Sequence, residues 1–430
     1  MNQRLVANLY LIFLLIGGYV YSTDVVDIVG IQWYYLSYLN ILFFIIVIYN
    51  KIKKRENQQE LFFLKNPVNL LYFIYFLFCC FSLIFSINLS VSIIGLSKIF
   101  ISLTSLFIIH ELKIYNYIKI NHLALIFSLG LLIEVFMSLK GYFSLIEVTD
   151  FKFKMAEVYL KGLSGNKNIT AASIAFKLPF LYYFIFKTRN KYLKALLLFA
   201  SAVVYFNLFL LSSRAIFLSL FLCFIFFLTA SIISMYLSKS NLKLFFQRIG
   251  IYILPILASG LYFYSSVSDE NIKVENRIST ISTNDTSAST RLRYYEKGIT
   301  YFTENPIFGA GIGNFQIVSI KLDSQNIESY IVPYVAHNDF IELLTEIGFF
   351  GTFIYLIFII SPFLFLIKVF LNSKDHIVQN VSIILTLPFI IYFVDSNLNF
   401  PQYRPEMQVS LLIYLTAIYF FYKKEILQKI

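Results

Sequence analysis

Residues 215–237 read AIFLSLFLCFIFFLTASIISMYL, a stretch of 23 residues that contains no charged side chain. A helix of this length spans about 35 Å, which is enough to cross the hydrocarbon core of a bilayer, about 30 Å thick. Comparable apolar stretches recur along the whole chain. Amides in lipid must be satisfied within the chain, and these stretches lack the alternation of period two that a membrane barrel needs. The sequence therefore predicts an all-α membrane protein.

The composition agrees with this prediction. Of 430 residues, 58% are hydrophobic and only 14% are charged, and the mean hydropathy is +0.73. A soluble domain of this size needs a larger polar share to cover its surface. The net charge of +11 comes from Lys and Arg in short loops between apolar stretches, which is the positive-inside pattern. We therefore expect membrane lipid, and not nucleic acid, as a partner.

Apolar length and loop charge predict a polytopic bundle of about 12 transmembrane helices that forms a single integral membrane domain over residues 1–430. The predicted spans are 5–22, 28–50, 67–86, 91–109, 121–139, 168–187, 195–212, 215–237, 249–267, 346–370, 381–396 and 407–422. The first is expected to be a retained span, not a removed signal peptide. Alternate loops carry the basic residues, so both termini are predicted to be cytoplasmic. The long loop 268–345, between spans 9 and 10, then lies on the outer side.

Ionisable residues within the predicted spans indicate where a site lies. They are Lys98, Glu134, Lys177, Arg214 and Asp395, each within about ten residues of the outer end of its span, or about 15 Å. This distribution predicts a polar site at the outer interface. It disfavours an ion-coupled transporter, whose charges gather near the midplane. The alternative is that Lys98 and Lys177 reach the outer head groups, and that Glu134 pairs with one of them.

Two arginine motifs are candidates for binding phosphate. In LSSRA, residues 211–215, Arg214 stands at a short break between two apolar stretches. In TRLRYY, residues 290–295, Arg291, Arg293 and Tyr295 begin a segment with helical spacing over 291–303, which we expect at the membrane surface. The planar guanidinium fork matches phosphate oxygens. For Arg214 the alternative is an interfacial anchor.

A glycine-rich segment follows the second motif. It reads NPIFGAGIGNF, residues 305–315, and its spacing does not fit a dinucleotide-binding loop. We interpret it as an irregular turn that needs positive φ angles or close packing.

His337 is the only one of the four histidines predicted on the outer side, in the stretch HNDFIELLTEIGFFG, residues 337–351. Imidazole is the natural general base near neutral pH. No second outer histidine or cysteine accompanies it, so we expect no zinc site. The alternative is a purely structural histidine.

The order of these motifs resembles the bacterial O-antigen ligase family, whose superfamily includes the O-antigen polymerases. The segments LSGNKN, residues 163–168, and 395–405 also resemble family features. The resemblance covers essentially the whole chain and is strongest over about 205–355. It implies a C-type glycosyltransferase architecture in the bacterial inner membrane, with the active site on the periplasmic face.

The resemblance further implies a metal-independent transfer that needs no nucleotide sugar and no cofactor. Our hypothesis is that the transfer inverts the anomeric centre. The donor would be a glycan on undecaprenyl diphosphate, and the acceptor would be lipid A–core or another surface glycan. Arg214 and Arg291 would hold the diphosphate, and His337 would activate or orient the acceptor hydroxyl. Asp395 matches an acidic position of the family, and Tyr295 stands where the family often has tryptophan. The predicted substrate-binding residues are Arg293, Asn338, Asp395, Lys177, Lys98 and Tyr295.

Two other functions stay open. A polymerase that joins O-antigen repeat units would share the donor, the arginines and the fold. A transporter of polysaccharides or small solutes would also have many spans, but it would need a polar path through the cytoplasmic half, where the sequence offers no deep polar residues.

Overall fold

The computed structural model describes residues 3–21, 27–54, 62–114, 119–149, 151, 155–238, 242–267, 286–326 and 334–427. These residues form helices and their connections, and no strand occurs among them. The predicted all-α fold is confirmed.

Among the described residues, ten helices are long and apolar enough to cross a membrane. They are α2 (Ile28–Lys54), α4 (Pro67–Ser82, continued by η2, Leu83–Phe85), α5 (Leu89–Glu111), α7 (Ile120–Ile146), α9 (Lys167–Lys187), α10 (Lys191–Leu211), α11 (Arg214–Leu237), α12 (Leu242–Val267), α16 (Asp339–Asn372) and α17 (His376–Leu398). Each of the ten contains most of one predicted span.

The first and last predicted spans, 5–22 and 407–422, are also helical but do not belong to these ten. The first corresponds to α1 (Gln3–Ile16) and η1 (Gly17–Tyr19), which together are shorter than the other spans. The last corresponds to α18 (Pro405–Tyr422), whose first turn includes Glu406 and Gln408. A polytopic helical membrane protein is confirmed, with ten long apolar helices among the described residues.

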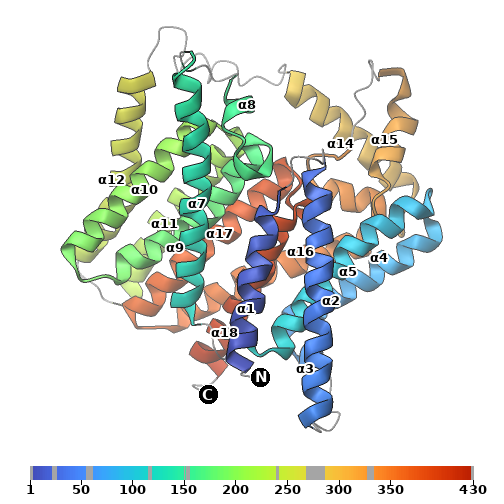
Figure 1. Ribbon diagram of the computed structural model, residues 1–430, viewed down its shortest axis with the longest axis horizontal. Coiled ribbons are helices and arrows are strands. Elements are labelled where there is room, and N and C mark those ends of the chain that lie inside the picture. Colours follow the sequence, from blue (N-terminus) through green and yellow to red (C-terminus); the bar gives the residue numbers. More distant parts are fainter. Residues whose placement is uncertain are drawn as a thin grey trace. The chain divides into compact units, whose positions relative to one another are not determined.

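Two compact units are distinguished, each built from three stretches of chain. Unit 1 comprises Met1–Tyr117, Ser282–Pro362 and Ser396–Ala417, and unit 2 comprises Ile118–Ile281, Phe363–Asp395 and Ile418–Ile430. In unit 1, α5 packs against α2 and α4. In unit 2, α9 packs against α7 and α10, and α10 against α12 (Figure 1). The single domain over residues 1–430 stays a prediction.

The described part of the predicted long loop includes a pair of α-helices that lie wholly within it. They are α14 (Thr286–Glu304) and α15 (Phe315–Asp323), which pack against each other (Figure 1). The predicted helix over 291–303 is thus confirmed, whereas 268–285 and 327–333 fall outside the described residues. Helix α16 begins at Asp339, earlier than the predicted start at 346, because Asn338 Oδ1 accepts hydrogen bonds from the Phe340 and Ile341 amides at 3.0 and 3.1 Å.

The glycine-rich turn fits into a break in α16. Gly348 has φ 72° and ψ −171°, and the Phe349 amide beyond it donates to Pro306 O at 2.8 Å. The Thr345 and Glu346 carbonyls, which the break releases, accept from two amides of the turn at 2.8 Å each. A Cβ at Gly348 would lie 2.2 Å from Ile307 O, so only glycine fits here. The predicted positive φ angles are confirmed at Gly309 (63°), Gly311 (89°) and Gly313 (82°).

Asn314 links the same turn by hydrogen bonds to the start of α5 and to the residue before it. Its Nδ2 donates to Ser92 Oγ at 2.6 Å, and its Oδ1 accepts from the Asn88 amide at 3.1 Å. The Phe315 amide donates to the carboxylate of Glu346 at 2.9 Å. Buried polar groups that satisfy one another make a rigid frame, and this frame carries the end of α14 and the start of α16.

Candidate functional site

His337 lies just before α16 in a left-handed backbone conformation, with φ 58°. Such a φ is uncommon for a residue with a side chain and persists only where its surroundings hold it. On one side, the Ala336 amide donates to Glu342 Oε2 at 2.8 Å. On the other side, Asn338 caps the helix. The turn therefore presents the His337 ring in a fixed direction.

The His337 ring packs edge-to-face against Phe400, with ring centroids 5.1 Å apart and an interplanar angle of 71°. The Arg404 guanidinium lies 4.3 Å from the centroid of the same Phe400 ring, a cation–π geometry. Among the described residues, His337 Nδ1 has no hydrogen-bond partner. The imidazole thus stands beside two cations, Arg291 and Arg404, whose charges both act on it.

Burial, followed by the charges of Arg291 and Arg404, lowers the pKa of His337 to about 4. The ring is then neutral at pH 7, which is the form that can accept a proton.

Arg291 and Tyr295 lie four residues apart and therefore share one face of α14. Arg291 Nη1 donates to Leu398 O at 2.9 Å. The Tyr295 hydroxyl donates to His337 O at 3.1 Å and lies 3.4 Å from Asn397 O. Burial raises the pKa of Tyr295, so the hydroxyl stays a donor.

Four of the predicted site residues thus come together in unit 1. Asn338 Nδ2 completes the group by donating to Asn397 O at 3.1 Å. We call the group the His337 cluster: Arg291, Tyr295, His337, Asn338, Phe400 and Arg404.

Sequence reasoning did not single out Phe400 and Arg404. The segment 395–405 resembles a family feature, but Asp395 is the only residue of it that the sequence predicts in the site. The available signal was Arg404 near two aromatic residues, Phe400 and Tyr403, in a segment that joins two apolar helices.

Two other predicted residues of unit 1 point elsewhere. Arg293, two residues from Arg291, lies on the opposite face of α14, where its Nε is 2.9 Å from Asp323 Oδ2 on α15. Lys98 on α5 places its Nζ 5.4 Å from the Tyr403 ring centroid, in η6 (Pro401–Tyr403). Substrate binding by either residue stays a prediction.

The remaining predicted residues belong to unit 2. Arg214 is exposed as the first residue of α11, after Ser212 with φ 45° and ψ 46°, so the predicted helix break is confirmed. Asp395 is fully buried near the end of α17. Lys177 forms a buried ion pair with Glu134, and Ser173 bridges both, at 2.6 Å from Lys177 Nζ and 2.9 Å from Glu134 Oε2.

Comparison with known proteins adds one finding. No curated protein matches the chain at a significant level. A family model described as O-antigen ligase matches residues 195–356, a segment that includes Arg214, Arg291 and His337. The match supports a glycosyltransferase-like enzyme and, together with the apolar helices, a bacterial multi-pass membrane protein. Over residues 195–356 the chain is thus similar to the O-antigen ligase family, and the resemblance seen in its motifs is confirmed there.

Proposed function

We propose that this protein transfers a glycan from undecaprenyl diphosphate to an acceptor hydroxyl at the periplasmic face of the inner membrane, as an O-antigen ligase does. The observation that carries the proposal is the His337 cluster. It sets a neutral imidazole beside two guanidinium groups, within and next to the segment that matches the family.

The cations suit a diphosphate leaving group. Diphosphate already leaves readily, so the main catalytic need is to stabilise the negative charge that develops on it. Arg291 is half-buried, and among the described residues only its Nη1 is engaged, by Leu398 O. The rest of its fork can donate to phosphate oxygens.

The imidazole suits the acceptor. In the proposed step, the acceptor oxygen forms a bond to the anomeric carbon from the face opposite the diphosphate. The bond from that carbon to the diphosphate oxygen breaks, undecaprenyl diphosphate leaves with the electron pair, and the configuration inverts. His337 takes the proton of the acceptor hydroxyl. Bound phosphate would offset the charges of Arg291 and Arg404 and so raise the pKa of His337, making it a better base when the donor is present.

The other residues have supporting roles in this proposal. Tyr295 and Asn338 hold the Asn397 carbonyl and the backbone of His337, and thereby position the ring. Arg214 matches the family motif and is exposed at the start of its helix in unit 2, and its role as a diphosphate ligand stays a prediction from the sequence. Roles for Lys98, Lys177, Arg293 and Asp395 rest on the sequence prediction alone.

Transfer in reconstituted vesicles tests the proposal. The donor is a glycan on undecaprenyl diphosphate, and the acceptor is lipid A–core. His337→Ala and Arg291→Ala should each lower the rate by roughly 10²–10⁴-fold. Matched controls are His376→Ala, an exposed histidine of unit 2, and Lys297→Ala, a cation on α14 outside the cluster. Full transfer by both cluster variants would refute the assignment.

A deletion strain separates the ligase from the polymerase. Without a ligase, no O-antigen reaches the core and lipid-linked polymer accumulates. Without a polymerase, the core keeps a single repeat. We expect the first pattern.

A further inference from the structure

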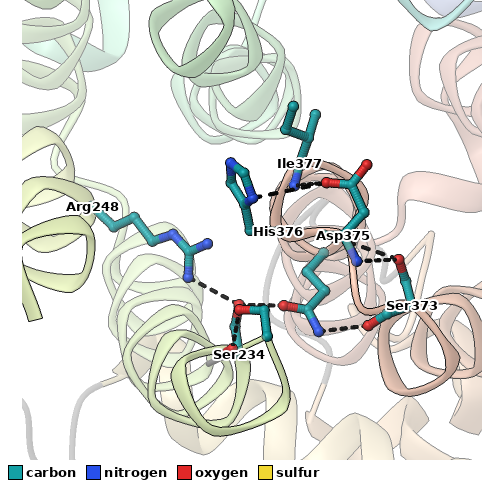
Figure 2. Close-up of polar contacts among 8 residues, drawn as sticks. Ser234, Arg248, Ser373, Asp375, His376 and Ile377 are labelled. Carbon is teal, nitrogen blue, oxygen red and sulfur yellow. Dashed lines mark hydrogen bonds and ion pairs between the residues drawn. The ribbon is translucent and has the colours of Figure 1, made fainter. Parts of the chain in front are cut away.

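Three helices of unit 2 meet around a buried arginine. Arg248, in the second turn of α12, is only 1% exposed. Its Nη1 donates to Ser234 Oγ near the end of α11 at 3.0 Å, and Ser234 Oγ donates to Gln379 Oε1 near the start of α17 at 2.6 Å (Figure 2). Gln379 Nε2 then donates to Ser373 O at 2.8 Å. We call these residues the Arg248 cluster: Ser234, Arg248, Ser373 and Gln379.

Along this cluster each residue donates a hydrogen bond to the next one, starting from Arg248. Ser373 O can only accept, so the Gln379 amide must turn its nitrogen to Ser373 and its oxygen to Ser234. The Ser234 hydroxyl therefore donates to Gln379 and accepts from Arg248. The Ser234 carbonyl is already engaged by the amide and the hydroxyl of Ser238, at 3.0 and 2.6 Å. The polar groups nearest to Arg248 are thus in use.

Two nitrogens of Arg248, Nε and Nη2, have no hydrogen-bond partner among the described residues. No carboxylate of the described part of the chain forms an ion pair with this arginine. Because the guanidinium keeps its charge in proteins, it cannot escape this environment by losing a proton. A buried charge with unsatisfied donors is costly, so a partner of opposite charge is expected.

The geometry points to a phosphate group as that partner, and we propose that Arg248 binds the phosphate of an anionic lipid head group. Nε–H and Nη2–H lie on one edge of the guanidinium and point in parallel directions. This edge donates to two oxygens of one phosphate. The ligand must accept and not donate, because the protein groups at hand leave donors unsatisfied.

The depth of the site favours a lipid over phosphate from solution. Arg248 lies six residues after Leu242, or about 9 Å along α12 from its start. At the same level, Phe246 (66% exposed) and Ile377 (61% exposed) present apolar surface outward, as lipid-facing side chains do. Exposed Lys243 and Lys374 lie nearer the helix ends, where they would attract anionic head groups.

This site is separate from Arg214, the residue of unit 2 that the sequence predicts to bind the diphosphate. Ser234 lies twenty residues after Arg214 on α11, about 30 Å along the helix, so the Arg248 cluster and Arg214 lie at opposite ends of α11. The basic residues of the neighbouring loops predict that the Arg248 end is cytoplasmic.

Thermal unfolding of the full chain in nanodiscs tests the inference. The discs contain phosphatidylcholine alone, phosphatidylcholine with phosphatidylglycerol, or phosphatidylcholine with added inorganic phosphate. We expect phosphatidylglycerol to raise the Tm of the wild type by about 3 °C. Arg248→Met should abolish this rise, and Arg248→Lys, which keeps the charge but loses the two-nitrogen edge, should reduce it. An equal rise with inorganic phosphate alone would overturn the lipid as the ligand and would show the anion site filled from solution.

Lys191→Met is the matched control, because it removes one exposed charge at the start of α10, outside the Arg248 cluster, and should keep the response. Glycan transfer by Arg248→Lys should stay at the wild-type rate, which separates this inference from the proposed function. The inference is overturned if Arg248→Met and the wild type respond equally to phosphatidylglycerol. It is also overturned if Arg248→Met is the more stable of the two in every disc, as expected for a charge that has no ligand.

Discussion

The His337 cluster of unit 1 and the Lys177–Glu134 pair of unit 2 contrast two ways of placing polar groups in a membrane protein. Lys177 and Glu134 are both at least 95% buried and face each other, with Ser173 bonded to both. His337 is half-buried, lies beside two arginines, and keeps Nδ1 without a partner among the described residues. The first arrangement satisfies its charges internally, whereas in the second we propose that a ligand completes the group.

The difference teaches that charge inside a predicted span does not by itself identify a functional site. A buried ion pair replaces lost hydration with its own contacts, so its chemistry is used within the fold. An imidazole whose neighbouring cations disfavour its protonated form stays neutral, and a neutral imidazole can accept a proton from a substrate. We therefore expect substitutions in the His337 cluster to change activity, and substitutions in the Lys177–Glu134 pair to change stability.

The largest effect is expected for transfer activity. His337→Ala should lower the rate by roughly 10²–10⁴-fold while the Tm stays near that of the wild type, since the ring packs mainly on Phe400. The measurements are initial transfer rates in vesicles and thermal unfolding of the same preparation. If His337→Ala unfolds at a much lower temperature, the ring is structural and the contrast between the clusters fails.

The converse effect is expected at the ion pair. Lys177→Met should destabilise the protein by about 3–5 kcal/mol, because it leaves the Glu134 carboxylate buried without its partner. The double variant Lys177→Met with Glu134→Leu should recover most of that loss. Denaturant unfolding of the three proteins measures both terms. A double variant as unstable as the single one would show that the pair does more than neutralise itself.

Much of the fold was predictable from the sequence because its determinants are local. Apolar length fixes the spans, and the positive φ angles at Gly309, Gly311 and Gly313 follow from the glycine pattern. The break at Gly348 was not predicted. It leaves the Thr345 and Glu346 carbonyls without helical partners, and the amides that bond to them belong to the glycine-rich turn, which is distant in sequence.

The site was predictable in part for the same reason. Arg291, Tyr295, His337 and Asn338 belong to motifs whose spacing is visible in the chain. Arg404 was missed because its importance comes from stacking on Phe400 beside a residue 67 positions earlier. The partner of Lys177 was left open for a similar reason, since Glu134 lies 43 residues away and two lysines were available to it.

Lowering the pH should destabilise the folded protein through His337 at pH values well above the folded pKa of this residue. The pKa of His337 is about 4 in the folded protein and about 6.5 as its ordinary value. Between these values the unfolded chain binds more protons than the folded one, so the stability from neutral His337 is complete above pH 6.5 and is lost as the pH falls towards 4. Tm measured from pH 7 to 4.5 should fall less steeply for His337→Gln than for the wild type. Equal slopes would mean that His337 is not held neutral.

The smallest effect is expected from Tyr295→Phe, which removes one hydroxyl and keeps the ring. The hydroxyl donates to His337 O at 3.1 Å and lies 3.4 Å from Asn397 O, so its loss should cost about 1 kcal/mol of stability. Because these carbonyls belong to the backbone that aims the imidazole, kcat should fall several-fold while KM for the lipid-linked donor stays the same. Tyr301→Phe, on the same helix but outside the cluster, provides the control. A change confined to KM would instead mean that the Tyr295 hydroxyl contacts the lipid-linked donor. Tyr295 would then bind substrate directly, in place of positioning His337 through the backbone.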